Sequence, residues 1–320
     1  MMNAKALVVG ATGSLGPSVI KELKRRNLGV RALVRDKAKA DLYFGKDSEL
    51  EIVQGSAASK ESLTGALEDC SYLFYLVNVP YHKWIDKVFP LLHASAEAAV
   101  KKNANLVFPG NVYNYGYAQY NPVDEKHPWD AHTKKGKIRI ELENYLKTEK
   151  EERGLKHTVV RMPDFYGPFV INTFSEKAYV NAIAGKPIRW IGDLDTPTEY
   201  IFIEDAGKAM VTAGLSDKST GEEFNAPAYE PITSRDYLTE IVNQAGSKSK
   251  ITTLNSDLIF NLAGVFSPLI REVQEMLYLK RTELILGGTK FKAAFGELPT
   301  RNYKDGIAST LDWAKDFYKL

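Results

Sequence analysis

Residues 10–16 read Gly10-Ala11-Thr12-Gly13-Ser14-Leu15-Gly16 and lie between an apolar run, Lys5–Val9, and an amphipathic stretch, Ser14–Arg26. This order predicts a strand, a tight turn and a helix. The first glycine permits a sharp exit from the strand, the second lets backbone approach a bound group, and the third lets the helix pack close to the sheet. Free N–H groups at the helix N-terminus attract phosphate. We therefore predict that a dinucleotide diphosphate is bound by Gly10, Thr12, Gly13, Ser14, Leu15 and Gly16.

Strand-like and helix-like segments continue to alternate through the first half of the chain. The predicted strands are Lys5–Val9, Val30–Val34, Leu50–Val53, Tyr72–Leu76, Leu106–Phe108 and His157–Arg161. The predicted helices are Ser14–Arg26, Ser59–Asp69, Trp84–Asn103 and Lys134–Arg153. This alternation predicts an α/β fold with a doubly wound parallel sheet of the Rossmann type.

The pattern changes after Pro168 and becomes mainly helical beyond Pro227. We expect a dinucleotide-binding domain over residues 1–168 and a smaller, mostly helical substrate-binding part over residues 169–320. Some strands and helices of the second part are expected to return to the first domain. The second part should lie over the carboxyl ends of the strands, where open α/β sheets bind ligands.

The composition is that of an ordinary soluble globular protein. Of the 320 residues, 44% are hydrophobic and 26% are charged, and 42 basic against 40 acidic side chains give a net charge of +2. This balance argues against a nucleic-acid partner, and no apolar run reaches membrane-spanning length. The single cysteine, Cys70, excludes an intrachain disulfide, and the five histidines lack metal-ligand spacing. We expect a cytoplasmic protein that binds neither membranes nor metal ions.

The end of the second predicted strand indicates which dinucleotide to expect. Arg35 follows it directly, with Lys37 and Lys39 close by. A guanidinium group can bind the 2′-phosphate of NADP and stack on its adenine. Asp36 offers the alternative of a carboxylate on the ribose 2′-hydroxyl, as in NAD enzymes, although it could equally cap a short helix. The basic residues favour NADP, with NAD as the alternative.

The segments Gly10–Gly16, Phe108–Gly116, Arg161–Pro168 and Tyr200–Asp205 resemble the short-chain dehydrogenase/reductase superfamily. The likeness covers nearly the whole chain and is closest to extended and atypical members, described as NAD-dependent epimerase/dehydratase-like or NmrA-like. The resemblance implies a doubly wound sheet and a C-terminal substrate domain. It also implies a catalytic Ser/Thr, Tyr and Lys, the last two spaced Tyr-x-x-x-Lys. The tyrosine would exchange a proton with the substrate, and the lysine would bind the nicotinamide ribose.

This chain departs from that triad. Lys137 stands where the family has its lysine, but Thr133 stands where it has tyrosine, and Asn111 takes the serine position. A threonine hydroxyl is too weak an acid to replace a phenol. The alternative for Lys137 is a surface lysine without a role. Its position favours a role, because it lies near the edge of the predicted buried face of its helix, which consists of Ile138, Leu142, Tyr145 and Leu146.

Two repairs of the triad remain open. Lys137 alone serves as proton relay and ribose ligand, as a resemblance to the isoflavone-reductase-like branch implies. Alternatively, a tyrosine takes the acid's place, from a cluster that otherwise reads as loop packing: Tyr113, Tyr115, Tyr117 and Tyr120. The catalytic candidates are therefore Lys137, Asn111 and Tyr113. Asn78, after the fourth strand, and Lys137 are also expected to contact the cofactor.

Two functions are consistent with these residues. The first is an NADP(H)-dependent oxidoreductase or epimerase-like enzyme acting on a small carbonyl or alcohol. The second is a non-catalytic NADP(H) sensor of the NmrA type, which the broken triad motivates. Thr198, where sugar-nucleotide members carry arginine, argues against a nucleotide-sugar substrate, while aromatic residues such as Tyr81 and Trp84 suit an apolar or planar molecule. We expect a monomer or weak homodimer, because Lys134–Arg153 has a predicted charged outer face of Arg139, Glu143, Lys147 and Lys150.

Overall fold

The computed structural model describes residues 4–320 except 46, 172–173, 259 and 261–267. Its centre is a parallel sheet with the strand order β11-β6-β5-β4-β1-β2-β3. The strands are β1 (Lys5–Val9), β2 (Gly29–Val34), β3 (Leu50–Gln54), β4 (Tyr72–Tyr75), β5 (Asn105–Gly110), β6 (His157–Arg161) and β11 (Glu222–Asn225). The order runs outward in both directions from β1 and β4, which confirms the predicted doubly wound Rossmann sheet.

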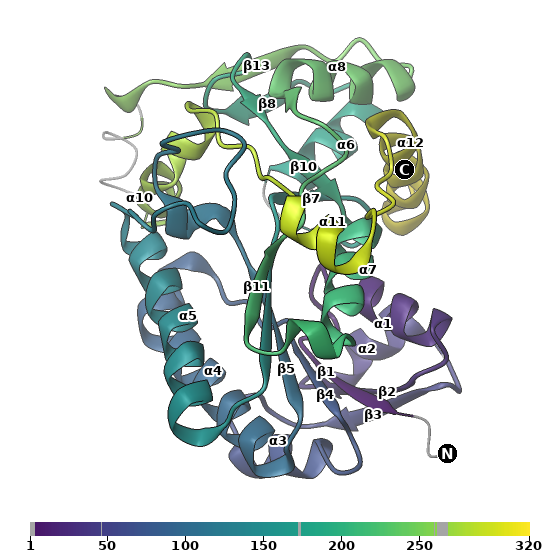
Figure 1. Cartoon of the computed structure of the whole chain (residues 1–320). Coiled ribbons are helices and arrows are strands. Elements are labelled where there is room, and N and C mark those ends of the chain that lie inside the picture. Colours follow the sequence, from purple (N-terminus) through teal and green to yellow (C-terminus); the bar gives the residue numbers. More distant parts are fainter. Residues whose placement is uncertain (1–3, 46, 172–173, 259, 261–267) are drawn as a thin grey trace.

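Helices cover both faces of this sheet, which is why its strands are apolar on both sides. In β1, Ala6 and Val8 pack into one core while Leu7 and Val9 pack into the other. Figure 1 shows α1 (Gly16–Arg25) and α7 (Ile203–Gly214) on one face, and α4 (Trp84–Lys102) and α5 (Lys134–Arg153) on the other. The helix α3 (Lys60–Ala66) packs beside α4.

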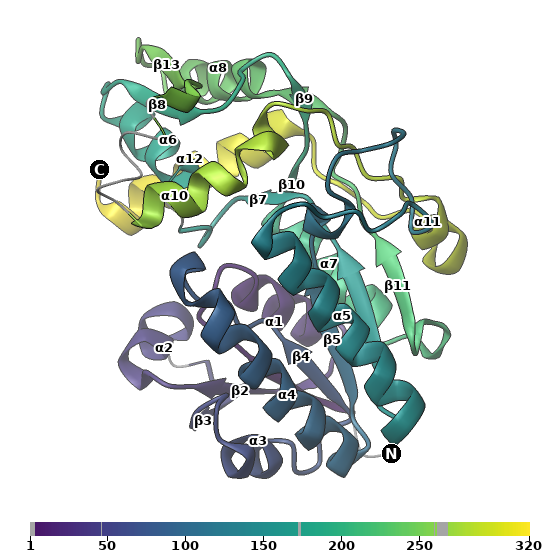
Figure 2. The same cartoon turned by 90° about the vertical axis from the view of Figure 1, so that its left-hand side faces the viewer.

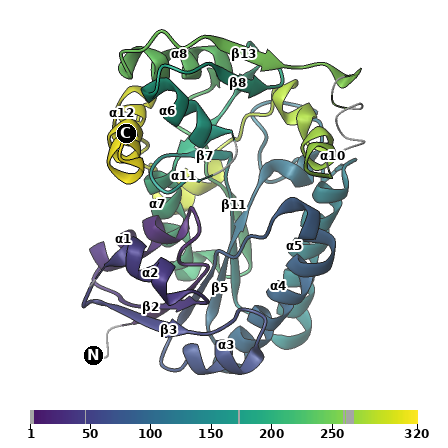
Figure 3. The same ribbon diagram turned by 180° about the vertical axis from the view of Figure 1, so that it is seen from behind.

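A second lobe lies above the carboxyl ends of the strands (Figures 1 and 3). Its described helices are α6 (Ser175–Ile183), α8 (Ser234–Gln244), α10 (Pro268–Glu275) and α12 (Tyr303–Tyr318), whereas α11 (Thr289–Phe295) packs against β11 of the main sheet. Its short strand pairs are β7 (Asp164–Tyr166) with β10 (Tyr200–Phe202), β8 (Ile188–Ile191) with β13 (Ile251–Leu254), and β9 (Pro197–Thr198) with β12 (Ile232–Thr233). A core of its own, rich in tyrosine, holds α6, α8 and α12 together.

Most predicted boundaries in the first half agree with the structure to within a few residues. The exception is α2 (Lys37–Phe44), which the expected helices did not include. It starts where Asp36 accepts a hydrogen bond from the Lys39 backbone N–H at 3.0 Å, so Asp36 is a helix cap. Within the described ranges, no helix is both long and apolar enough to cross a membrane.

Candidate active site

The glycine turn, Gly10–Gly16, joins β1 to α1 at very close quarters. Gly10 has φ +91°, and a Cβ on it would lie 2.5 Å from the Leu76 carbonyl oxygen. A Cβ on Gly16 would lie 2.1 Å from the Ala11 carbonyl oxygen. Side chains are therefore excluded here, and bare backbone is presented at the start of α1. This is a cradle of the kind that holds a dinucleotide diphosphate.

The basic end of β2 lies near this turn. Arg35 is exposed directly after the strand, and Lys39 lines a cavity together with Thr12 and Ser14 of the glycine turn. The carboxylate of Asp36 caps α2 through Oδ1, and its second oxygen is not used by this hydrogen bond. Exposed cations and one carboxylate oxygen thus lie together at the end of β2.

Two asparagines follow neighbouring strands at the same edge of the sheet. Asn78 comes after β4 and is exposed, and its Oδ1 accepts a hydrogen bond from Val79 N at 2.9 Å. Asn111 comes after β5 and caps η2 (Val112–Tyr115), with Oδ1 accepting from Tyr113 N at 3.1 Å. Each amide uses its oxygen locally, so the amide nitrogen is the group that can donate to a ligand.

A pair of tyrosine hydroxyls forms the centre of the site. The hydroxyls of Tyr81, in η1 (Tyr81–Lys83), and Tyr113 are 2.8 Å apart, and either can be the donor. Burial raises the pKa of both phenols, and the negative charge of nearby Asp164 raises it further. Both hydroxyls are therefore protonated at neutral pH. We refer to Tyr81 and Tyr113 as the tyrosine pair.

The other tyrosines of the predicted cluster lie elsewhere. Tyr115 is fully buried, and its hydroxyl donates to Asn225 Oδ1 at 2.9 Å. Tyr117 is 53% exposed, and Tyr120 is exposed with its hydroxyl 2.8 Å from Asp124 Oδ1. Of the four candidates, Tyr113 is the one that joins the pair.

Lys135 lies beside the tyrosine pair and is almost completely buried. Its Nζ is 5.1 Å from the centre of the Tyr81 ring. It forms ion pairs with Glu275, at 2.6 Å, and with Glu272, both on α10, and its backbone N–H donates to Glu275 as well. Figure 2 shows α10 lying across the N-terminal ends of α4 and α5. A charged lysine in this position is thus stabilised by two carboxylates from the second lobe.

Arg139, one turn further along α5, is a half-buried cation of a different kind. Its guanidinium stacks over Trp84 at 4.9 Å and Phe108 at 5.5 Å, and donates to the Pro109 carbonyl oxygen at 3.2 Å. Burial lowers its pKa. Among the described residues no carboxylate lies within ion-pair distance of it, and its Nε is buried without a hydrogen-bond partner. A cation in this state is ready for an anionic or hydroxylated ligand.

The buried face of α5 differs from the expected one. It consists of Lys135, Gly136, Leu142, Glu143, Leu146 and Glu149. Lys137 is exposed, so its expected position at the edge of the buried face is not observed. Thr133 caps α5, its hydroxyl accepting from Gly136 N at 3.0 Å. Lys135 and Arg139 are four residues apart, as are Thr133 and Lys137, but they lie two residues further along α5.

The predicted charged outer face of α5 is also wrong in two positions. Glu143 is only 1% exposed because it forms a fully buried ion pair with Arg161 of β6. Arg139 turns inward to the aromatic rings described above. Two of the four charged residues on which the expectation of a monomer or weak dimer rested are therefore not on the outer face.

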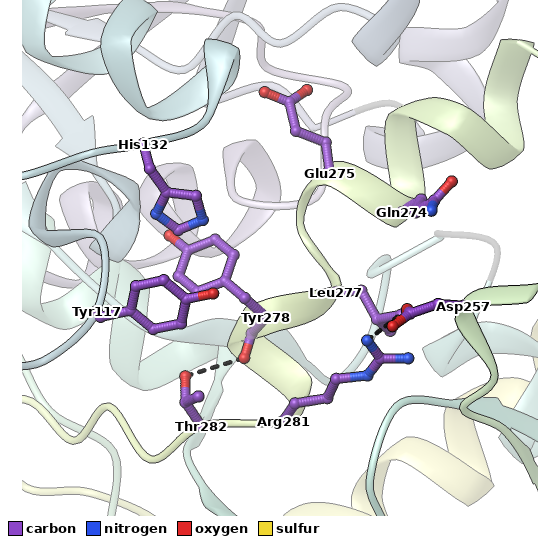
Figure 4. Close-up of a pocket in the computed structure, with 9 residues that line it drawn as sticks. All are labelled: Tyr117, His132, Asp257, Gln274, Glu275, Leu277, Tyr278, Arg281 and Thr282. Carbon is purple, nitrogen blue, oxygen red and sulfur yellow. Dashed lines mark hydrogen bonds and ion pairs between the residues drawn. The ribbon is translucent and has the colours of Figure 1, made fainter. Parts of the chain in front are cut away.

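A pocket of about 260 Å³ opens next to Glu275 (Figure 4). On one side three rings gather: Tyr117 and His132 stack 4.6 Å apart, and Tyr278 packs edge-on against both. On the other side Arg281 forms an ion pair with Asp257 at 2.6 Å. The pocket thus has a flat aromatic wall and a polar wall, and Glu275 connects it to Lys135.

Sequence reasoning missed Lys135, Arg139 and the carboxylates of α10. The signal for the first two was present, because Lys135, Arg139, Leu142 and Leu146 recur at the spacing of one helix face. No comparable signal existed for Glu272 and Glu275, whose contact with α5 spans 137 residues or more.

Comparison with known proteins agrees with the observed fold. The chain is 24% identical over 272 residues to a UDP-glucose 4-epimerase of Mycolicibacterium smegmatis, covering 76% of this chain and 83% of that protein. Among solved structures, UDP-glucose 4-epimerase of Thermotoga maritima with UDP-glucose matches with a TM-score of 0.80 and 17% identity, over 98% of this chain and 99% of that one. The dTDP-glucose 4,6-dehydratase of Bacillus anthracis in complex with NAD matches with a TM-score of 0.82 and 15% identity, over 99% and 98%.

At these identities the structural likeness establishes the fold. The family is established separately, because the family model described as "NmrA-like family" matches residues 2–248, most of the chain. Together with the Rossmann sheet and the glycine turn, this match confirms the predicted resemblance: the chain belongs to the NmrA-like family.

Proposed function

We propose that this protein is an NADP(H)-dependent oxidoreductase or epimerase-like enzyme that acts on a small carbonyl or alcohol. The observation that carries the proposal is the grouping of the tyrosine pair, 2.8 Å apart, with the cations Lys135 and Arg139. The group lies at the sheet edge that also carries the glycine turn. A dinucleotide held by that turn would supply or accept the hydride, while the protein's own side chains handle the proton.

The proposed cofactor residues are those around the glycine turn. Gly10 and Gly16 leave no room for a Cβ against the backbone of Leu76 and Ala11, which brings the start of α1 close to the end of β1, as in dinucleotide-binding turns. Similar folds are solved with NAD, which supports a nicotinamide dinucleotide. NADP is favoured over NAD because Arg35 and Lys39 are exposed cations, whereas Asp36 uses one of its carboxylate oxygens to cap α2. Asn78 is proposed to contact the cofactor through its amide nitrogen.

Tyr113 is the proposed proton donor. Its hydroxyl is protonated because burial raises its pKa, so in carbonyl reduction it can pass a proton to the oxygen as that oxygen becomes an alkoxide, a much stronger base. Tyr81 is within hydrogen-bond distance and can return a proton to Tyr113. The positive charge of Lys135 near the Tyr81 ring stabilises the phenolate formed during this relay. Asn111 can orient the substrate oxygen through its amide nitrogen.

Arg139 is proposed to contact the cofactor ribose from below the tyrosine pair. Its stacked, unpaired guanidinium is fixed in place by aromatic rings before any ligand arrives. This proposal assigns to Arg139 the part that we first expected of Lys137. The aromatic wall formed by Tyr117, His132 and Tyr278 suits a planar carbonyl compound.

The test has two parts. Calorimetric titration with NADPH, NADP⁺, NADH and NAD⁺ should show tightest binding of the phosphorylated pair, reduced in Arg35→Ala. NADPH oxidation with a panel of planar and aliphatic carbonyls should then be measured for wild type, Tyr113→Phe and the control Tyr120→Phe, whose exposed hydroxyl contacts Asp124. We expect activity in wild type and the control but a loss of roughly 100-fold or more in Tyr113→Phe. Equal rates in the two variants would remove Tyr113 from the mechanism.

The second candidate is a non-catalytic sensor of NADP(H). The observation that favours it is the absence of a tyrosine at the start of α5, where Lys135 is instead tied to two carboxylates. A sensor must bind the oxidised and reduced cofactors with different affinity, because a ligand that does not discriminate between states cannot shift them. Equal affinities together with measurable turnover would eliminate this candidate.

A further inference from the structure

Asp164 opens β7 beside the tyrosine pair. The parallel strands β5 and β6 are paired with Gly110 opposite Arg161, so the chain leaves both strands side by side. Three residues beyond these positions lie Tyr113 and Asp164. Burial raises the pKa of the Tyr113 hydroxyl, and the charge of Asp164 raises it further, so the carboxylate lies within electrostatic range of the pair. Figure 2 shows β7 where the two lobes meet.

The carboxylate of Asp164 has one oxygen engaged and one available. Its Oδ2 forms an ion pair with Lys280 Nζ at 2.6 Å. Across the ranges that the structure describes, no hydrogen-bond donor or cation contacts Oδ1. The Asp164 side chain is 55% exposed, so Oδ1 can accept a hydrogen bond from a ligand.

Lys280 holds Asp164 from the buried side. The lysine side chain is only 15% exposed, and its Nζ is 4.8 Å from the centre of the Tyr200 ring. Its backbone packs tightly against Gly192, where a Cβ would lie 2.3 Å from Lys280 Cβ. The backbone N–H of Asp193 also donates to the Lys280 carbonyl oxygen at 2.8 Å. The ammonium group is therefore the buried partner, and the accessible charge of this ion pair is negative.

The other ion-pair group beside the tyrosine pair has the same polarity. Lys135 is almost completely buried, whereas its partners Glu272 and Glu275 are partly exposed. Two carboxylates against one ammonium group also leave a net negative charge there. In both groups the carboxylates are thus the more exposed partners. A site whose accessible charges are carboxylates attracts cationic ligands and repels anionic ones.

We propose that Asp164 binds an ammonium group of the substrate, so that the site selects amino-carbonyl and amino-alcohol compounds over carbonyl compounds that carry a carboxylate or a phosphate group. This inference rests on the proposed function, because it assumes that the carbonyl or hydroxyl group is bound at the tyrosine pair. An ammonium group that donates to Oδ1 lies nearer to the carboxylate than to the ammonium group of Lys280 on Oδ2, so attraction exceeds repulsion. Asp164 holds the substrate and takes no part in the transfer of the proton or the hydride.

The experiment compares three small ketones that differ mainly in charge: aminoacetone, a cation; hydroxyacetone, which is neutral; and pyruvate, an anion. Their binding to the full chain is measured by ligand-observed NMR in the presence of NADP⁺, which cannot reduce them, and kcat/KM is measured with NADPH. We expect wild type to bind aminoacetone about tenfold more tightly than pyruvate, which is the scale of one charge-assisted hydrogen bond. Hydroxyacetone should lie between the two, and Asp164→Asn should remove the preference.

Two further variants and a control make this result specific. Asp164→Asn leaves Lys280 buried without its partner, so the double variant with Lys280→Met, which removes both charges, is measured as well and should also lose the preference. Lys280→Met alone keeps the carboxylate and should strengthen the preference for aminoacetone, a change that general damage to the site would not produce. The matched control is Asp195→Asn, which removes another exposed carboxylate paired with a cation, Arg235 at 2.6 Å, and should leave the preference unchanged.

The outcomes separate this inference from the function on which it rests. If wild type binds aminoacetone no better than pyruvate, the inference about Asp164 is overturned, and reduction of the ketones by NADPH would leave the proposed function standing. If the preference is present in wild type and lost in both Asp164 variants, but no ketone is reduced, Asp164 binds a cation as inferred and the proposed activity is wrong. A preference that persists in both Asp164 variants refutes the inference.

Discussion

Replacing Lys135 by methionine tests the assignment of the site to the buried face of α5. The lysine side chain is 2% exposed and ion-paired with Glu272 and Glu275, whose side chains are 32% and 19% exposed. Breaking a fully buried pair by removing one partner costs about 3–5 kcal/mol. Because both carboxylates can partly rehydrate, we expect a smaller loss of roughly 2–3 kcal/mol in Lys135→Met. The matched control, Lys137→Met, changes an exposed side chain and should stay within about 0.5 kcal/mol.

The assay is thermal unfolding together with NADPH-dependent turnover. For a chain of this length, 1 kcal/mol corresponds to roughly 2 °C, so Lys135→Met should unfold about 4–6 °C below wild type and Lys137→Met within about 1 °C. Turnover should fall roughly 100-fold in the first variant and little in the second. Lys135→Arg, which keeps the charge, should recover most of the stability. A larger loss in Lys137→Met than in Lys135→Met would refute the assignment.

Two further predictions concern stability alone. Burial raises the pKa of Glu199 from 4.5 to about 7, so the folded state keeps this proton to higher pH than the unfolded chain does, and its contribution to stability is lost as pH rises from about 4.5 through 7. Unfolding by denaturant should be measured at pH 5 and pH 8 for wild type and Glu199→Gln. Relative to wild type, the free energy of unfolding of Glu199→Gln should be up to about 3 kcal/mol higher at pH 8 than at pH 5, and His157 does not affect this comparison because it titrates alike in both proteins. The same difference between the two proteins at both pH values would contradict this. Gly65, in α3, has an ordinary φ and open space where a Cβ would be, so Gly65→Ala should raise the free energy of unfolding by about 0.5–1 kcal/mol, and a decrease would show an unrecognised need for glycine.

Local patterns were sufficient to predict the sheet and the cofactor cradle. The glycine turn, the strand before it and the helix after it are contiguous in sequence, and each constrains the others sterically. The position of Arg35 could also be predicted locally, because it follows β2 directly in the sequence. Asp36 was ambiguous because a carboxylate after a strand can cap a helix or bind a ribose, and only the backbone of α2 decides between them.

The catalytic side of the site could not be predicted in the same way. Its members come from separate elements: Tyr81 precedes α4, Tyr113 follows β5, and Glu272 and Glu275 belong to α10. Their meeting depends on how the second lobe packs against α5, which no local spacing encodes. Lys137 was expected from its place in a linear motif that Thr133 breaks, whereas the buried face of α5 carries Lys135 instead.

Buried charge also bears on the choice between enzyme and sensor. Lys135 forms ion pairs with two carboxylates, whereas Arg139 lies over the rings of Trp84 and Phe108 with its Nε buried and without a hydrogen-bond partner, and a buried polar group is costly unless it is hydrogen-bonded. Both candidate functions supply a partner for this group, because both bind the cofactor.

Only the enzyme also needs an uncharged group that donates a proton to the substrate and a neighbouring group that returns a proton to it. The hydroxyls of Tyr81 and Tyr113, in contact at 2.8 Å, can serve as such a donor and relay, whereas the equally close hydroxyls of Tyr179 and Tyr237 lie in the core of the second lobe. The position of the tyrosine pair after β4 and β5, and not the contact itself, therefore favours the proposed catalysis, even though the usual tyrosine of α5 is missing.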